Sequence, residues 1–325
     1  ELKSLLDLGI VSIALSYLNT GITDAADNIQ VRVGEFTRTD GTTSAIGEYL
    51  FNRDTANSID EPIANLPPEI AELPNIQGAG NVASLHKAMA DDTSGDLQDL
   101  VEAFIAEDDV AARNVLMEQI LIKWTGSDTI SPTSRGGVFD AQKLAVMEKF
   151  FGIDFSGNPT TNAVALLTSS YTNLVENMYV SLIAETHLKN LLDLVEFDTT
   201  GNISFNWVRA EIDDLIGTDQ SAAVVMLGEF ARIIRYYNLG SNEAFLAFRG
   251  HYAVQSEVYA KAIDFAGTQP IVGTSGDDSL STSGNQTALD GGDGNDYLYA
   301  NTTSNVALYG GAGNDTIYGS AGDDI

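Results

Sequence analysis

The sequence predicts a multidomain protein with a small α+β N-terminal piece, a mainly α-helical central domain and a C-terminal array of short repeats. Three observations carry this prediction. The chain has 325 residues, which is long for a single domain. Apolar residues recur at helical spacing through the middle of the chain. A nine-residue period of glycine, aspartate and large apolar residues occupies the end.

Residues 1–55 are expected to form the small α+β segment. Leucines within residues 2–6 predict a short helix, and residues 10–17 predict a strand. Two further strands are expected on either side of an Asp-Gly turn at residues 40–41. Residues 56–80 hold four prolines and little periodicity, which is typical of an ordered connector and not of a helix.

Residues 81–267 are expected to form a helical domain of about six to eight helices. Leu97, Val101 and Phe104 recur at the spacing of one helix face, and a longer apolar stripe runs through residues 167–182. Each stripe covers only one side of its helix. The helices therefore need one another to bury their apolar faces.

Residues 268–325 contain the pattern G-G-x-G-x-D-x-U-x, in which U is a large apolar residue. The apolar positions follow one another at intervals of 9, 9, 10 and 9 residues: Leu280, Leu289, Leu298, Leu308 and Ile317. Three glycine-rich turns are well formed, at residues 276–278, 291–296 and 310–315, and the two turns between them lack the aspartate and most of the glycines. A flexible Gly/Ser/Asp linker is the alternative that composition alone suggests. The shared register of turns and apolar positions argues against a linker.

This pattern resembles the RTX, or haemolysin-type calcium-binding, repeat family. The resemblance implies a parallel β-roll, in which each glycine-rich half of a repeat makes a turn and each apolar half makes a short strand. The predicted fold class is therefore multidomain: a small α+β N-terminal piece, a mainly α-helical central domain and a C-terminal parallel β-roll of calcium-binding nonapeptide repeats. One coil of a β-roll takes two repeats, so alternate turns are expected to stack on one edge and share ions.

The residue types explain how such turns can hold calcium. Glycine permits positive φ and close approach of backbone carbonyl groups, and aspartate adds a carboxylate. Calcium takes six to eight oxygen ligands of both kinds. The expected ligands are Gly276, Asp278, Gly292, Asp293, Gly294, Asp296, Gly311, Gly313, Asp315 and Asp324. We expect about two ions on the edge with the complete turns, between Asp278 and Asp296 and between Asp296 and Asp315, and few or none on the other edge.

Without metal, the clustered carboxylates should repel one another and leave this segment disordered. Calcium binding would then supply the folding free energy of the segment. The whole chain carries a net charge of −30, which opposes binding to nucleic acid or to anionic lipid. It contains no cysteine, which excludes disulfides and thiol catalysis, and no apolar run long enough to span a membrane.

A second resemblance covers roughly the first 130 residues. Stretches such as NIQGAGNVASLHKAM and MEQILIKWTGSD are similar to FrpC-like iron-regulated RTX proteins. In that family the matching segment follows a calcium-triggered self-processing module that cuts an Asp-Pro bond. This chain contains no Asp-Pro dipeptide, so we expect no cleavage within it. The RTX resemblance implies type I secretion and an extracellular or cell-surface location. Glu1 and Ile325 read as ends cut from a longer protein.

No catalytic motif is found in the sequence. The three histidines, His86, His187 and His251, do not lie in H-E-x-x-H, and no G-x-S-x-G is present. We therefore expect a non-enzymatic, calcium-binding segment of a large secreted RTX protein, with a helical module that is structural or binds a partner. A protein partner, a cell-surface partner and self-assembly stay open. The alternative is a fragment of a secreted RTX toxin or hydrolase, or of a calcium-dependent self-processing protein, whose active part lies in the helical domain or outside this chain.

Overall fold

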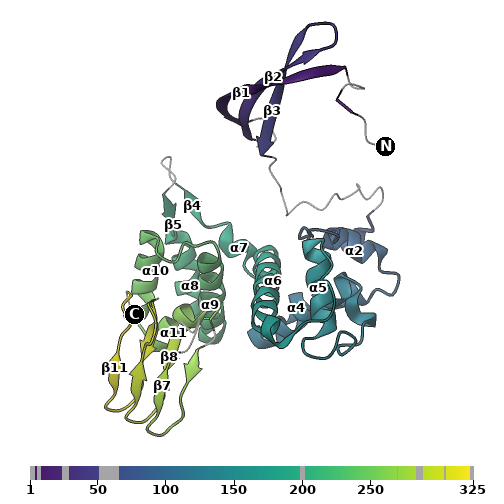
Figure 1. Cartoon of the computed structure of the whole chain (residues 1–325). Coiled ribbons are helices and arrows are strands. Elements are labelled where there is room, and N and C mark those ends of the chain that lie inside the picture. Colours follow the sequence, from purple (N-terminus) through teal and green to yellow (C-terminus); the bar gives the residue numbers. More distant parts are fainter. Residues whose placement is uncertain are drawn as a thin grey trace. The chain divides into compact units, whose positions relative to one another are not determined.

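The computed structural model describes residues 4–5, 9–23, 29–50, 66–197, 202–268, 270–282, 288–303 and 305–322. The chain divides into two compact units, Glu1–Asn57 and Ser58–Ile325. The first unit contains only β-structure in its described residues. The second contains the helices and, after them, a series of short strands (Figure 1).

The first unit is a three-stranded antiparallel sheet. Its strands are β1 (Ile10–Thr23), β2 (Ile29–Arg38) and β3 (Thr43–Leu50), and they pair in that order. The strand expected at residues 10–17 is therefore present and continues six residues further, to Thr23. The short helix expected within residues 2–6 falls largely outside the described residues.

The turn between β2 and β3 is the Asp-Gly turn that the sequence indicates. Asp40 Oδ1 accepts hydrogen bonds from the Thr42 amide at 2.9 Å and from its Oγ1 at 2.7 Å. Gly41 adopts a φ of 81°, which glycine reaches without steric cost. This local geometry reverses the chain and sets the register of the hairpin, in which Thr37 faces Thr43.

Eleven α-helices lie in the described residues of the second unit. They are α1 (Pro68–Ala71), α2 (Leu85–Asp91), α3 (Asp96–Ala106), α4 (Val110–Trp124), α5 (Ala141–Phe151), α6 (Val164–Glu185), α7 (Lys189–Leu192), α8 (Asn206–Thr218), α9 (Gln220–Tyr236), α10 (Glu243–Ala253) and α11 (Glu257–Phe265). We call them together the helical module. A two-stranded hairpin of β4 (Glu196–Phe197) and β5 (Ile203–Ser204) separates α7 from α8.

The described chain contains ten α-helices within residues 81–267, more than the six to eight expected from the sequence. One of them, α7, is four residues long, too short to show an apolar period. Helix α1 also corrects the expectation that residues 56–80 hold no helix. Pro68 occupies its first turn, where the missing N–H of proline costs nothing.

Polar side chains begin many of the helices as N-caps. Asp109 accepts a hydrogen bond from the amide of Ala112 at the start of α4. Asp219 does the same for the amide of Ala222 at the start of α9. Such caps satisfy amide groups that have no partner within the helix. Part of the acidic excess of the chain is therefore used to define helix ends.

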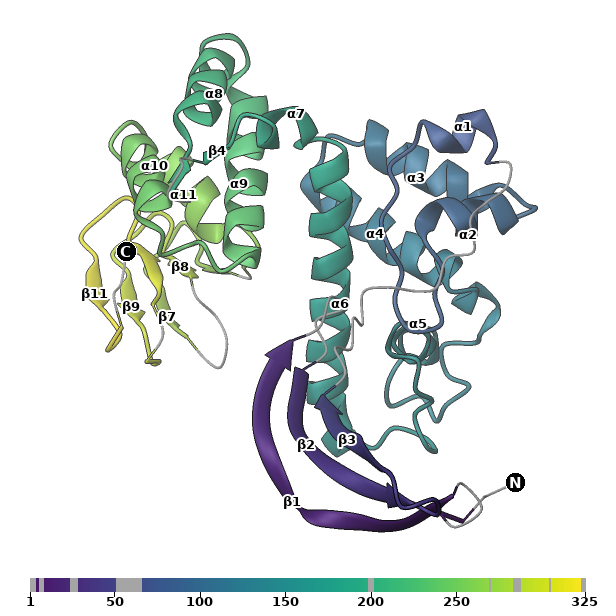
Figure 2. The same cartoon turned by 90° about the horizontal axis from the view of Figure 1, so that it is seen from above.

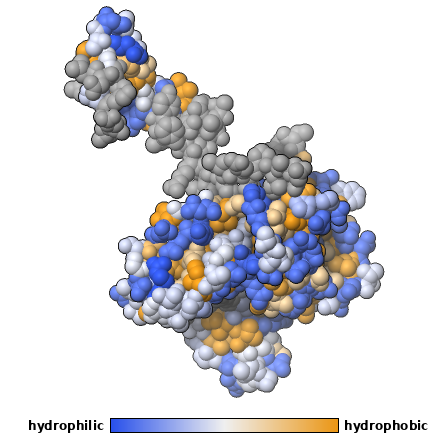
Figure 3. All heavy atoms as spheres, turned by 90° about the vertical axis from the view of Figure 1, so that its right-hand side faces the viewer, coloured by the Kyte–Doolittle hydropathy of each residue, from blue (hydrophilic) through white to orange (hydrophobic). Residues whose placement is uncertain are grey.

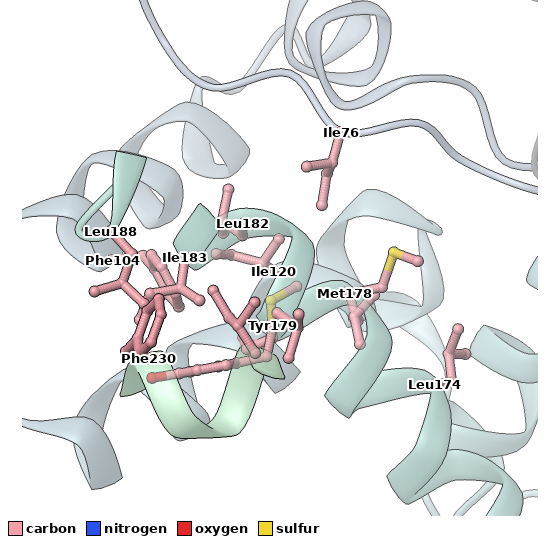
Figure 4. Close-up of a cluster of buried hydrophobic side chains, with 14 of the residues drawn as sticks. Ile76, Phe104, Ile120, Leu174, Met178, Tyr179, Leu182, Ile183, Leu188 and Phe230 are labelled. Atoms are coloured by element: carbon pink, nitrogen blue, oxygen red, sulfur yellow. The ribbon is translucent and has the colours of Figure 1, made fainter. Parts of the chain in front are cut away.

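The core of the second unit lies around α6, the longest helix. Helices α4 and α5 pack against α6 on one side and α9 on the other (Figure 2). In Figure 4, Tyr179 and Ile183 of α6 lie close to Phe104 of α3, and Phe230 of α9 lies beside them. Burying this apolar surface is the main source of stability for the helical module.

A buried charged cluster crosses the same core. Tyr179 Oη donates a 2.8 Å hydrogen bond to Glu229 Oε2 and accepts one of 3.2 Å from Arg113 Nε. Arg232 lies over the ring of Tyr179 and forms an ion pair with Glu176. Burial raises the pKa of the Glu229 carboxyl, and the neighbouring guanidinium groups oppose that shift. The cluster joins α4, α6 and α9 through paired charges, as buried charges require.

The last part of the chain forms two parallel three-stranded sheets. One contains β6 (Ile271–Val272), β8 (Ala288–Asp290) and β10 (Ala307–Tyr309). The other contains β7 (Ser279–Ser281), β9 (Tyr297–Tyr299) and β11 (Thr316–Tyr318). The chain therefore alternates between the two sheets, strand by strand. We call the chain from β6 to β11 the repeat segment.

The apolar positions of the repeats are in register across both sheets. Leu298 of β9 pairs with Leu280 of β7 and with Ile317 of β11. Leu289 of β8 pairs with Leu308 of β10 in the other sheet. Each repeat is thus paired with the repeat after the next, as expected for coils made of two repeats.

No helix in the described parts of the chain is long and apolar enough to cross a membrane. Figure 3 shows one face of the protein, on which hydrophilic residues are widespread and apolar ones gather in smaller patches.

Phe230 offers a test of the core. It is fully buried, and its ring packs at 5.4 Å from Phe205 and at 5.2 Å from Phe248. We expect Phe230→Ala to lower the free energy of unfolding by about 3–5 kcal/mol, because it leaves a cavity. Urea unfolding followed by the helical circular dichroism signal measures this change. Leu246→Ala, at an exposed position of α10, is the control and should change stability by less than about 0.5 kcal/mol. Equal effects of the two changes would contradict the assigned core.

Candidate metal centre

Three glycine-rich turns lie on one edge of the repeat segment. Each connects a strand of the β6–β8–β10 sheet to the next strand of the other sheet, at residues 273–278, 291–296 and 310–315. Because the strands within each sheet are parallel and in register, the three turns stack directly over one another. We call them the first, second and third turns.

Backbone hydrogen bonds tie the second turn to the third. The Gly294 amide donates to the Ala312 carbonyl at 2.8 Å, and the Ala312 amide donates to the Gly292 carbonyl at 2.9 Å. Asn314 N donates to Asn295 Oδ1 at 3.0 Å. In the same way, Asn295 N donates to Asp277 Oδ1 of the first turn at 2.8 Å. On the solvent side of the stack, the side chains of Asp277 and Asn295 thus each accept a hydrogen bond from the backbone of the next turn. We call Asp277, Asn295 and Asn314 the ladder.

The aspartate at the sixth position of each turn faces inward. The Asp278 amide donates to Asp296 Oδ1 at 2.8 Å, and the Asp296 amide donates to Asp315 Oδ1 at 2.9 Å. Asp296 is only 2% exposed, and its Oδ2 is buried without a hydrogen-bond partner in the described structure. A buried carboxylate oxygen without a partner is energetically unfavourable unless a cation compensates its charge.

Asp278 holds a different set of partners. Its Oδ2 accepts hydrogen bonds from the Thr274 amide at 2.6 Å and from Thr274 Oγ1 at 2.8 Å. These bonds, led by the one from the amide, lower the pKa of the Asp278 carboxyl. The side chain is therefore ionised near neutral pH, as a calcium ligand must be. Thr274 was not among the expected site residues, and its place four residues before the aspartate is the only sequence signal for this role.

Glycine is required where the turns approach one another. Gly292, Gly294, Gly311 and Gly313 all have positive φ, between 89° and 136°. A Cβ atom at Gly311 would collide with the carbonyl oxygen of Gly292, and one at Gly313 would collide with that of Gly294. Backbone oxygens of one turn therefore lie against the Cα atoms of the next, in a space that only glycine leaves open.

The first glycine of the second turn and that of the third turn lie equally close to aspartate side chains. A Cβ atom at Gly291 would meet both Asp296 Oδ2 and the Gly310 carbonyl oxygen, and one at Gly310 would meet Asp315 Oδ2. A carboxylate oxygen and a carbonyl oxygen of the neighbouring turn thus converge beside the first glycine of the second turn. Oxygens of these two kinds are the ligands that calcium takes.

The structure brings together nine of the ten expected ligand residues. The glycines at positions 276, 292, 294, 311 and 313 and the aspartates at positions 278, 293, 296 and 315 all lie in the three stacked turns. Asp293 is exposed, whereas Asp296 is buried. Asp324 lies outside the described residues. Sequence analysis missed Asp277, Asn295 and Asn314, which form the ladder; their position just before each sixth-position aspartate is a signal that could have identified them.

In the part of the chain that the structure describes, no three histidine, aspartate or glutamate side chains come close enough together to form a metal site by themselves. The stacked turns instead provide one inward-facing carboxylate each and a larger number of backbone carbonyl groups. This donor set contains only oxygen and suits a hard cation such as Ca²⁺ better than a soft transition metal.

Comparison with known proteins agrees with this donor set. A model of the RTX calcium-binding nonapeptide repeat (4 copies) matches residues 265–298, 272–307 and 307–325. The chain is 25% identical over 278 residues to the iron-regulated protein FrpA of Neisseria meningitidis serogroup C. This match covers 70% of the chain but only 25% of that relative, so the chain spans about a quarter of the relative's length. No solved structure matches the chain.

Both resemblances expected from the sequence are confirmed by these matches. The repeats match over the segment whose turns stack, and the similarity to an iron-regulated protein extends well beyond the repeats. The C-terminal part of the chain therefore consists of RTX calcium-binding nonapeptide repeats, and calcium ions are their ligand.

Proposed function

We propose that the repeat segment is a β-roll that binds about two calcium ions between its stacked turns and depends on them to fold. The observation that carries this proposal is the buried Asp296 carboxylate. Its Oδ1 binds the amide of Asp278 in the first turn, and its Oδ2 has no partner among the described residues. Because Asp296 lies in the middle turn of the three, its carboxylate can bind an ion on either side.

The proposed ligand set follows the stack. One ion would lie between the first and second turns, with Asp278 and Asp296, and the other between the second and third turns, with Asp296 and Asp315. The glycines at positions 276, 292, 294, 311 and 313 would contribute backbone carbonyl groups or the room for them. Asp293, at the exposed rim, completes the proposed set for these two ions. Asp324, in the incomplete turn that follows β11, would be a ligand at the opposite edge only. A bound calcium ion would supply the positive charge that the buried carboxylate oxygens need.

The opposite edge would bind few ions or none. In its described part, the turn between β9 and β10 contains alanine, asparagine, threonine and valine but no carboxylate. Each turn of the first edge carries a carboxylate and the described residues of the opposite edge carry none, so the proposed roll is asymmetric, as the uneven repeats indicate. The strands from β7 to β11 have three residues and one central apolar side chain each, and β6 has only two residues, so strand burial alone offsets little of the ordering entropy.

We infer that the whole chain acts as a non-enzymatic segment of a larger exported protein. The repeat segment would stay unfolded at low calcium and fold outside the cell, where extracellular modules bind calcium with Kd of about 10⁻⁴–10⁻³ M. The histidine partners support a structural role for the helical module. His86 and His187 each bind a backbone carbonyl group, those of Leu73 and Glu107. His251 lies beside the Asp213 carboxylate on the surface.

The experiment that tests this function is a calcium titration of the chain by calorimetry, with far-UV circular dichroism recorded on the same samples. We expect about two ions to bind and a β signal to appear with them. Magnesium should substitute poorly, because it demands near-octahedral geometry and keeps its water ligands. A chain that binds no calcium, or binds it without change in the β signal, would refute the proposal.

Substitution of the three inward aspartates should give a distinctive pattern of stoichiometry. Asp296→Asn should abolish both ions, because that carboxylate serves both sites, whereas Asp278→Asn and Asp315→Asn should each leave about one ion. Calorimetric stoichiometry measures the difference. Asp99→Asn, at an exposed position of α3, changes the net charge equally and should leave both ions bound. If the three substitutions each removed the same number of ions, the shared role of Asp296 would be wrong.

Substitution of a turn glycine tests the close approach of the backbone. Gly311→Ala should weaken or abolish the ion between the second and third turns, because its Cβ would strike the Gly292 carbonyl oxygen and φ is 89°. Gly217→Ala is the matched control. Nothing lies within 4 Å of the added Cβ there, so alanine fits in the last turn of helix α8 and should leave calcium affinity unchanged. Calcium affinities of the two variants decide the matter, and a Gly311→Ala chain with unchanged affinity would refute this geometry.

A further inference from the structure

The two sheets of the repeat segment differ in what covers their outer faces. In the β7–β9–β11 sheet the outward residues are exposed, and Tyr297, Tyr299 and Tyr318 are each between 42% and 50% accessible. In the β6–β8–β10 sheet, Ala288 and Ala307 occupy the equivalent outward position and are buried. Figures 1 and 2 place β8 beside α11, with β7, β9 and β11 farther from the helices. The helical module therefore covers one sheet and leaves the other open.

A single aspartate anchors this contact. The side chain of Asp264, in α11, is 0% exposed, and four donor atoms from three residues converge on it. Arg249 donates from Nε at 2.8 Å and from Nη2 at 2.6 Å, and Arg235 Nη2 lies at 3.3 Å. The fourth donor is the hydroxyl of Tyr309 in β10, at 2.6 Å. The repeat segment thus completes a charge cluster that α9, α10 and α11 begin.

The ring of Tyr309 also contacts side chains of α11. The Phe265 ring packs edge-on against it with centroids 5.4 Å apart, and Lys261 Nζ lies 5.3 Å from its centroid. Burial and the Asp264 carboxylate raise the pKa of the Tyr309 hydroxyl, so it stays a proton donor throughout the physiological range. A hydrogen bond from a neutral donor to a buried carboxylate is among the stronger kinds.

A second contact joins α11 to the neighbouring strand. Lys261 Nζ binds Asp290 Oδ1 of β8 at 2.8 Å and also Glu257 Oε1 at 2.7 Å. Asp290 and Tyr309 are paired in register, at the third position of their strands. One helix therefore holds two successive strands of the same sheet, one coil apart.

We propose that α11, with Arg235 and Arg249, is a docking platform for strands β8 and β10 of the roll, and that docking and calcium binding are thermodynamically coupled. This inference rests on the proposed calcium-dependent folding of the repeats. Each coil of a repeat array contacts only its neighbours in the stack, and a preformed surface against one sheet adds contacts that the array itself does not supply. Because coupling between two binding events is reciprocal, the platform raises calcium affinity and calcium stabilises the docked helical module.

The test compares two tyrosine substitutions in the full chain. Each variant is titrated with calcium as the only added ligand. Tyr309→Phe removes the hydroxyl that binds Asp264 and keeps the ring. Tyr318→Phe makes the same change at the third position of β11, on the exposed sheet. We expect Tyr309→Phe to weaken calcium binding about tenfold with unchanged stoichiometry, as expected for loss of a hydrogen bond to a charged group. Tyr318→Phe should bind calcium like the unmodified chain.

A second readout follows the reciprocal effect. Calcium should raise the melting temperature of the helical signal in the unmodified chain and in Tyr318→Phe, and should raise it less in Tyr309→Phe. Lys261→Met, which removes the ion pair with Asp290 from the other side of the contact, should act in the same direction. It serves as the independent variant if Tyr309→Phe does not fold.

The outcomes separate this inference from the proposed function. If the unmodified chain binds no calcium, the proposed function fails. If it binds calcium, and both Tyr309→Phe and Lys261→Met stay within threefold of its affinity and keep its calcium-induced shift in melting temperature, the coupling alone is refuted.

Discussion

The register that pairs each repeat with the repeat after the next is the constraint on which the rest of the repeat segment depends. It places Leu280, Leu298 and Ile317 side by side in one sheet. The same register stacks the three complete turns on one edge, so that an aspartate from each faces the space between turns. A slip by one repeat would set complete turns against incomplete ones and separate the carboxylates.

The two parts of the second unit are stabilised by different physical effects. The helical module buries a large apolar core around α6 and pairs its few buried charges. The strands of the repeat segment bury few side chains, namely Ala288, Leu289, Leu298 and Ala307, and Ile317, in the last described strand, is 46% exposed. In the proposed function, the repeat segment relies on backbone ladders, on compensation of its carboxylates by calcium and on its contact with α11. The proposal thus assigns to one chain a helical module that folds by apolar burial and a repeat segment whose folding responds to calcium.

The sequence predicted much of this arrangement because the signals are local and periodic. The apolar period located the centres of β7 to β11, and helical spacing located residues such as Leu97 and Phe104 in the core. The glycines of the complete turns indicated where the backbone approaches itself. By contrast, the four residues of helix α1 are too few to show an apolar period, and Pro68 is as typical of a connector as of the first turn of a helix.

The contacts that sequence reasoning did not find join residues far apart in the chain. Asp290 of β8 binds Lys261, 29 residues earlier. Tyr309 reaches Asp264 across 45 residues. No spacing rule predicts such pairs, because they depend on where a helix packs against a sheet. The expected turn ligands, in contrast, follow from one repeated pattern.

The most direct test of the central claim is the crystal structure of the calcium-bound chain, with the ions located by their anomalous scattering. We expect one ion on each side of Asp296, both on the edge formed by the first, second and third turns. Ions on the opposite edge only, or a strand register that separates Asp278, Asp296 and Asp315, would contradict the claim.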